Sequence, residues 1–155
     1  MSSAKFLRRH RTEIDVLIEV HTILTMPPYQ RRVGGVHIDF TGPGQDMLDM
    51  AEYYSKNTEE KILHILIKFK PSECTDIDVL ERIAQQICQD IGKRYQDIYA
   101  VHLEDPKQPH IHIIFNMVSF RGGMLYCHQY DRERIQYYIH MAILTTGIHL
   151  PKLQK

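Results

Sequence analysis

An α+β fold, in which helices pack on a largely antiparallel sheet, is the fold class that this sequence predicts. Residues 61–69 alternate apolar and polar side chains, residues 76–91 repeat apolar ones at helical spacing, and residues 97–120 form two strand-like runs joined by a polar loop. Strands joined in this way pair antiparallel, and the intervening helices supply the covering layer. The 155 residues predict a single domain, with a helix and a mobile loop region in 1–59 and a motif-bearing core in 60–150.

The N-terminal residues predict one helix followed by a long loop. Residues 12–24 repeat apolar side chains at helical spacing, on a face made of Ile14, Leu17, Ile18 and His21 or Leu24. Pro27 and Pro28 end that helix. The loop runs to about Gly44, and the alternation of Val36, Ile38 and Phe40 predicts one short strand inside it. A second helix is expected near residues 45–55.

The next segments predict a strand and a helix. Side chains of the strand over 61–69 divide into an apolar face, Leu63, Ile65, Ile67 and Phe69, and an opposite face with His64 and Lys68. The helix over 76–91 is amphipathic, and Cys88 is expected in its buried stripe. Thr75 and Asp78 come close to a capping box at its start, and Gly92 ends it.

The last third of the chain predicts two strands, a turn and a helix. Residues 97–103 and 110–120 alternate as strands do, and the loop EDPKQP between them indicates an antiparallel hairpin. The run Arg121-Gly122-Gly123 predicts a second turn that leads into a short strand. Residues 131–146 predict a final helix that Gly147 ends.

Composition narrows the class of protein. Cys74, Cys88 and Cys127 lie far apart without a CxxC pair, which argues against a zinc knuckle or a disulfide framework and favours a reducing, cytoplasmic setting. Apolar runs fall short of the roughly 20 residues of a membrane span, so no membrane partner is expected. Net charge is zero, yet basic residues outnumber acidic ones six to three in 1–35 and six to two in 107–155. The protein can therefore still have a basic face that binds the phosphate backbone of a nucleic acid.

Three histidines at the hairpin form the leading candidate site. The period of two places His110, His112 and Asn116 on one face of their strand, and the hairpin brings His102 beside them. Three neutral imidazole nitrogens on a rigid surface can hold a divalent metal and leave coordination positions open for a substrate oxygen. Because the chain has ten histidines, the pattern also fits a strand face that is merely polar.

These residues also carry a resemblance to a known family. The segments KILHILIKFKPSE and AVHLEDPKQPHIHIIFNMVSFRGGMLYCH, with the helix between them, resemble the relaxase/mobilisation nuclease family of the HUH single-strand endonucleases. The resemblance is close over residues 60–150 and loose over 1–59. A histidine in the family's first strand matches His64, an HxD element matches at His102, and an HxHxxxN element matches at His110, His112 and Asn116.

The resemblance implies a relaxase-like sheet related to the ferredoxin and RRM folds, and a metal site on three histidines. The ligands would be His102, His110 and His112, and the cofactor would be Mn²⁺ or Mg²⁺, with Zn²⁺ as a further option. The partner would be single-stranded DNA, together with other mobilisation proteins.

The family's nucleophile is a point of departure. Relatives attack the scissile phosphate with a tyrosine near the N-terminus, and that position falls here on Val20 or His21. Three replacements stay open: His21 itself, Tyr29 in the loop PPYQRR, and Tyr137 or Tyr138 on the last helix. Each also has an ordinary structural interpretation as a helix, loop or packing residue.

Other family positions are altered as well. The family aspartate after the first motif histidine is replaced by Glu104, which is expected to orient His102 or to accept a proton. A family serine is replaced by Lys68, which either holds a phosphate or is an ordinary surface lysine. The residues expected to contact DNA are Arg31, Arg32, Lys68, Asn116 and Arg121.

Three functions follow. The first is metal-dependent nicking and strand transfer on single-stranded DNA of a mobile element, as in plasmid conjugation and mobilisation. The second is a catalytically degenerate relaxase-like protein that binds DNA or assists mobilisation without cutting. The third, a metal-binding or protein-interaction domain without a nucleic-acid role, is favoured by the zero net charge and the acidic middle of the chain.

Overall fold

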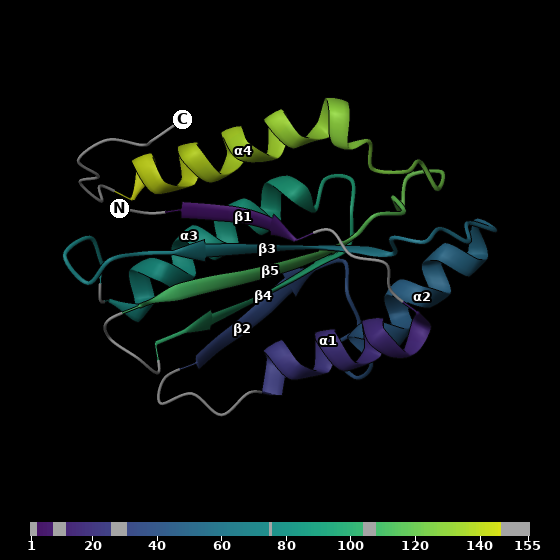
Figure 1. Cartoon of the computed structure of the whole chain (residues 1–155), viewed down its shortest axis with the longest axis horizontal. Helices are drawn as coiled ribbons and strands as arrows, with labels where there is room; N and C mark the ends of the chain where they lie inside the picture. Colours follow the sequence, from purple (N-terminus) through teal and green to yellow (C-terminus); the bar gives the residue numbers. More distant parts are fainter. Residues whose placement is uncertain (1–2, 8–11, 26–30, 75, 104–107, 147–155) are drawn as a thin grey trace.

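The computed structural model describes residues 3–7, 12–25, 31–74, 76–103 and 108–146. Within them lies one antiparallel sheet with the strand order β1-β3-β5-β4-β2 (Figure 1). The strands are β1 (Ser3–Leu7), β2 (Arg31–Val36), β3 (Ile62–Lys68), β4 (Asp97–His102) and β5 (His110–Asn116). The helices are α1 (Glu13–Thr25), α2 (Pro43–Tyr53), α3 (Ile77–Ile91) and α4 (His128–Thr145). The expected α+β class and the expected hairpin of β4 and β5 are confirmed.

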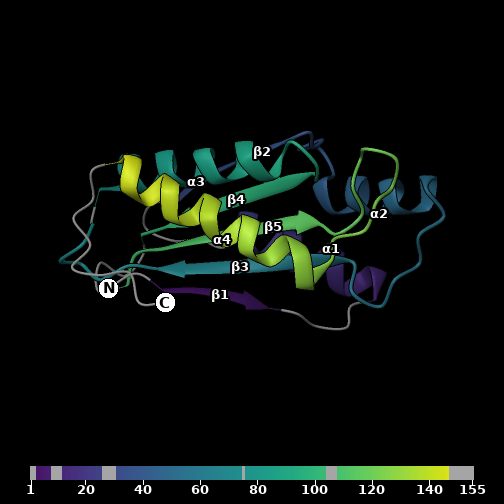
Figure 2. The same cartoon turned by 90° about the horizontal axis from the view of Figure 1, so that it is seen from above.

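Helices cover both faces of the sheet. In Figure 2, α3 and α4 lie over one face, and Figure 1 places α1 and α2 below the other. Alternation along β5 supplies both cores, since Ile111, Ile113 and Phe115 pack under α3 and α4 whereas Ile114 packs under α1. The central strands are therefore apolar on two sides, and polar residues among them need a specific reason to be there.

The strands of the N-terminal part differ from the prediction in two ways. The short strand expected over residues 36–40 lies instead at Arg31–Val36, where it pairs with β4 along the edge of the sheet. His37 ends it with a φ of +54°, outside the range of an extended strand. The other edge strand, β1, pairs with β3 and was not expected.

The buried face of α1 also differs from the prediction. Ile14 and Ile18, placed on the core stripe, are 67% and 59% exposed. The residues that pack on the sheet are Val16, Val20 and Ile23. This helix is apolar on more than one side, so helical spacing alone selected the wrong stripe.

Helix ends and turns differ by a few residues. The cap of α3 is Asp76, whose carboxylate accepts from the amide of Asp78, and the predicted partner Thr75 lies outside the described residues. Helix α4 begins at residue 128 because the Asp131 carboxylate accepts from the amide of Cys127 and so caps an earlier turn. Gly147, expected to end α4, lies outside the described residues.

The second turn is present, but its strand is not. Gly122 and Gly123 both have a φ of +73°, as the prediction of a turn required. β5 ends at Asn116, and beyond it the described chain forms one isolated bridge between Val118 and Leu125 instead of the expected short strand.

A buried carboxyl on β4 makes the stability of the fold depend on pH. Asp97 is fully buried, and its Oδ1 accepts a hydrogen bond of 3.0 Å from the amide of Val36. Burial raises its pKa from 3.8 to about 8, since hydrogen bonds from Cys88 and Val36 only partly offset the loss of water. The folded state thus holds this proton more tightly than the unfolded state. The resulting stabilisation is complete below about pH 4 and is lost as pH rises to about 8.

We therefore expect the free energy of unfolding to fall less between pH 4 and pH 8 in Asp97→Asn than in the native chain. Urea unfolding across this range measures it, with Asp49→Asn, an exposed carboxylate on α2, as the matched control. Equal pH dependence in the native chain and in Asp97→Asn would contradict the prediction.

Candidate metal centre

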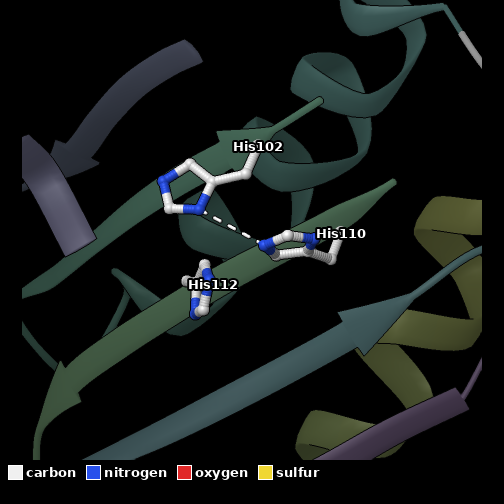
Figure 3. A group of neighbouring side chains, drawn as sticks. All are labelled: His102, His110 and His112. Carbon is white, nitrogen blue, oxygen red and sulfur yellow. Dashed lines mark hydrogen bonds between the residues drawn. The ribbon is translucent and has the colours of Figure 1, made fainter. Parts of the chain in front are cut away.

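The hairpin of β4 and β5 brings three histidines together. His102, the last residue of β4, pairs with His110, the first residue of β5, and His112 follows on the same face. This face is the one beneath α1, because Ala100 and Ile114 on it belong to the core that α1 covers. One ligand atom of each histidine lies within 4.8 Å of the other two, and the three rings converge in Figure 3.

Backbone carbonyls fix the tautomers of His102 and His110. The Ile23 carbonyl on α1 lies 3.1 Å from Nε2 of His102. The Gln108 carbonyl lies 2.9 Å from Nδ1 of His110. Because a carbonyl oxygen only accepts, these two nitrogens donate. Nδ1 of His102 and Nε2 of His110 then each direct a lone pair at the other, and the two nitrogen atoms are 3.3 Å apart. Two lone pairs at this distance repel unless a proton or a cation lies between them.

The third histidine supplies an unsatisfied nitrogen. Nε2 of His112 is buried and has no hydrogen-bond partner among the described residues. Burial, followed by the neighbouring charges of His64, His110 and His102, lowers the pKa of His112 to about 2. The ring is thus neutral at physiological pH, and its lone pair is available to a metal.

These features fit a divalent metal ion. A cation bound by the three nitrogens would remove the repulsion between His102 and His110 and would satisfy the buried nitrogen of His112. His110 and His112 are only partly buried, which leaves a side of the site open to a substrate. An all-nitrogen set suits Mn²⁺, Zn²⁺ and Ni²⁺, and holds Mg²⁺ only loosely.

A fourth histidine lies behind the three. His64 on β3 stands opposite Ile114, and its Nε2 lies 2.8 Å from Nδ1 of His112. Only 7% of His64 is exposed, so its contacts are made inside the protein. It supports a candidate ligand and does not itself face the open side.

Asn116, one of the residues expected to contact DNA, is buried at the end of β5 opposite to His110. The side chain is 1% exposed, and its amide nitrogen donates at 3.0 Å both to the carbonyl of Met47 and to Oε1 of Gln96. Its oxygen accepts from the amide of Val118 at 3.1 Å. The carboxamide therefore joins α2 and the segment after β5 to the sheet, which is a structural role.

Two of the basic residues expected to contact DNA flank the histidines. Arg31 on β2 pairs with His102, and Lys68 on β3 pairs with His110. Residues paired directly across antiparallel strands project from the same face. Both cations thus lie on the histidine face, one on each side of the site.

The other two basic residues lie elsewhere. Arg32 projects from the opposite face, where its guanidinium is 3.1 Å from Oδ1 of Asp78 and 3.5 Å from Oε1 of Glu81, both on α3. Arg121 follows the far end of β5 and lies over the ring of Phe120. The structure brings neither of them to the histidines.

The candidate nucleophiles lie in different parts of the chain. His21 is exposed on α1, along a groove of about 850 Å³ whose walls include Val33 and Phe40. Tyr29 lies outside the described residues, in a segment that joins α1 to Arg31, the residue paired with His102. Glu104, the expected orienting carboxylate, lies outside the described residues as well.

Helix α4 does not bring a tyrosine to this site. Tyr138 packs against the core beneath α3 and α4, and Tyr137 is 60% exposed on the same helix. Helix α4 lies on the side of the sheet opposite to α1 (Figure 1), and the histidines are on the face that α1 covers.

Three groups that shape the site were not among the expected residues. The carbonyls of Ile23 and Gln108 fix two tautomers, but backbone groups leave no mark in a residue pattern. The third group is the carboxylate of Glu19 on α1, which lies beside His64. This carboxylate had no usable signal in the sequence, since it falls on the stripe of Val16, Val20 and Ile23, which only the structure identifies as the buried one.

Comparison with known proteins gives a family match that covers most of the chain. A family model for the nuclease domain of MobA/VirD2-like relaxases matches residues 30–144. No curated protein matches the chain. Within the part of the chain that the structure describes, none of the helices has the length and apolarity that crossing a membrane requires.

Proposed function

The chain belongs to the relaxase family of MobA/VirD2-like nucleases, and we propose that it nicks single-stranded DNA of a mobile element in a metal-dependent transesterification. The observation that carries this proposal is the convergence of His102, His110 and His112, with one buried nitrogen unsatisfied. A divalent ion held there, Mn²⁺ or Mg²⁺ with Zn²⁺ as a further option, would draw charge from a phosphoryl oxygen as a Lewis acid.

The reaction would proceed by exchange of one phosphodiester bond. A nucleophilic side chain, Tyr29 or His21, forms a bond to phosphorus, and the bond to the 3′ oxygen of the neighbouring nucleotide breaks. The electron pair leaves with that oxygen, which takes up a proton and becomes a 3′ hydroxyl. We assign Glu104 to orient His102 or to accept the proton of the nucleophile.

Arg31 and Lys68 would hold the phosphates on either side of the scissile bond. Bases next to that bond would lie along the groove beside α1, where half of the surface of Phe40 is exposed for stacking. The strand would then cross the open side of the histidine site.

Arg31→Ala is expected to weaken binding of single-stranded DNA and to lower the slope of log affinity against log salt by about 0.7 if this side chain neutralises one phosphate. Arg32→Ala is the matched control, since Arg32 belongs to the same strand but projects from the other face and pairs with Asp78. Fluorescence anisotropy over a salt series measures both. Equal slopes for the two variants would remove Arg31 from the DNA-binding face.

The experiment that tests the function is incubation of the chain with labelled single-stranded origin oligonucleotides and Mn²⁺ or Mg²⁺. A denaturing gel would separate the cleaved product from a protein-linked one. A protein-linked product that needs both the metal and His110 would support the proposal, and binding without any product would favour the second candidate.

That second candidate is an accessory protein that binds DNA, or other mobilisation proteins, without cutting. It is favoured by the sequence of α1, EIDVLIEVHTILT, which has no tyrosine where relatives carry their nucleophile. In this case the histidine site would still hold a metal, and DNA binding would still depend on salt.

A further inference from the structure

A line of three polar side chains runs from α1 to the metal site. Glu19 on α1 places its Oε1 3.8 Å from Nδ1 of His64, and Nε2 of His64 lies 2.8 Å from Nδ1 of His112. These groups are largely shielded from water, with 20% of the Glu19 side chain and 8% of the His64 side chain exposed. Residue 19 precedes the segment that the relaxase model matches, so the family match assigns it no role.

The contact between the two histidines can form in two ways. Either Nδ1 of His112 donates to Nε2 of His64, or the reverse. In the first case Nε2 of His112 carries a lone pair that faces the site. In the second it carries the proton, and that nitrogen is then a buried donor without a partner among the described residues, unable to bind a cation.

The carboxylate decides between these states. A neutral imidazole has one N–H. Nδ1 of His64 is buried without a hydrogen-bond partner among the described residues, and the negative charge of Glu19 at 3.8 Å favours the proton on that nitrogen. His64 then has only a lone pair at Nε2, so His112 has to donate from its own Nδ1. The proton positions along Glu19, His64 and His112 are thus set from one end.

We propose that Glu19, acting through His64, is a positioning residue that holds His112 in the tautomer whose Nε2 binds the metal. The proposal rests on the proposed function only in taking Nε2 of His112 as a metal ligand. His102, His110 and His112 then share one arrangement. In each ring, one nitrogen donates to an acceptor of the protein, and the other nitrogen presents its lone pair to the site.

The first test is made on the metal-free protein. Long-range nitrogen-15 NMR of the histidine rings reports which nitrogen carries the proton. We expect His112 to be protonated at Nδ1 in the native chain and to become a mixture of tautomers in Glu19→Gln, whose neutral amide presents either a donor or an acceptor to His64. In Glu13→Gln, an exposed carboxylate on the same helix, the native tautomer should persist.

The second test is metal affinity, measured by titration with Co²⁺ and followed by its visible absorption. Glu19→Gln and His64→Leu are expected to bind at least about tenfold more weakly, the usual cost of losing a group behind a metal ligand. His64→Gln should recover much of the loss, because its carboxamide oxygen can accept from Nδ1 of His112. Thermal unfolding of each metal-free variant shows whether the fold is intact, and the isosteric Glu19→Gln tests the proposal if His64→Leu does not fold.

The outcomes separate this proposal from the function itself. Native His112 protonated at Nε2, or a tautomer unchanged in Glu19→Gln, would overturn the positioning role whether or not a metal binds. A tautomer that responds as expected in a chain that binds no Co²⁺ would support the role of Glu19 and count against the metal site. Weaker Co²⁺ binding in Glu19→Gln, rescued in His64→Gln relative to His64→Leu, would support both.

Discussion

Replacing His112 by alanine is expected to abolish metal-dependent cleavage and to weaken metal binding by more than about a hundredfold. Loss of a residue that only supports a metal ligand weakens binding by up to about a hundredfold, and loss of the ligand itself should cost more. The variant removes Nε2, the buried nitrogen without a partner among the described residues. It leaves His102 and His110, whose facing nitrogens are 3.3 Å apart and hold a cation poorly without a third ligand.

Two measurements check this prediction. Titration with Mn²⁺ or Co²⁺ gives the affinity, and thermal unfolding with and without metal gives the stabilisation that binding provides to the native chain. His140→Ala, on α4 across the sheet, is the matched control and should keep both the metal-induced stabilisation and the cleavage. Undiminished metal binding by His112→Ala would mean that the three histidines are only a polar strand face.

Much of the fold was predictable because the local pattern and the tertiary fold agree in the core. Alternation along residues 110–116 assigned each side chain to a face, and in the structure the two faces contribute to two separate cores. The short loop after residue 103 determined the hairpin, and the hairpin determined that His102 meets His110. The three histidines could thus be predicted to lie together, because the period of a strand and the pairing of a hairpin were sufficient to place them.

Edges and helix faces were less predictable because neighbours distant in the sequence decide them. β1 has no local signal strong enough to define a strand, and its pairing with β3 supplies the hydrogen bonds. On α1 both Ile18 and Val20 fit an apolar stripe, and only contact with the sheet selects Val20. Glu19 was overlooked for the same reason, since its neighbour His64 is 45 positions away in the chain.

The second large effect is expected at the nucleophile, where Tyr29→Phe should reduce formation of the protein-linked DNA by a factor of at least about 10³. The variant removes a single oxygen, the one that would bond to phosphorus, and keeps the ring. Tyr29 is tested first because it lies two positions before Arg31 in the sequence, and Arg31 pairs with His102. A gel assay of adduct formation under single-turnover conditions measures the effect.

The bond formed identifies the attacking atom independently of the variants. A phosphate ester of tyrosine survives acid, whereas a phosphorus–nitrogen bond to an imidazole hydrolyses in acid, so acid treatment of the adduct distinguishes Tyr29 from His21. Tyr137→Phe should leave the yield unchanged, because Tyr137 belongs to α4, which lies on the side of the sheet opposite to α1. Loss of the adduct in His21→Ala together with acid lability would transfer the role to the imidazole. An adduct that forms in neither the native chain nor any variant, despite intact DNA binding, would make this relaxase domain an accessory protein, in which the histidine site holds a metal without a nucleophile to use it.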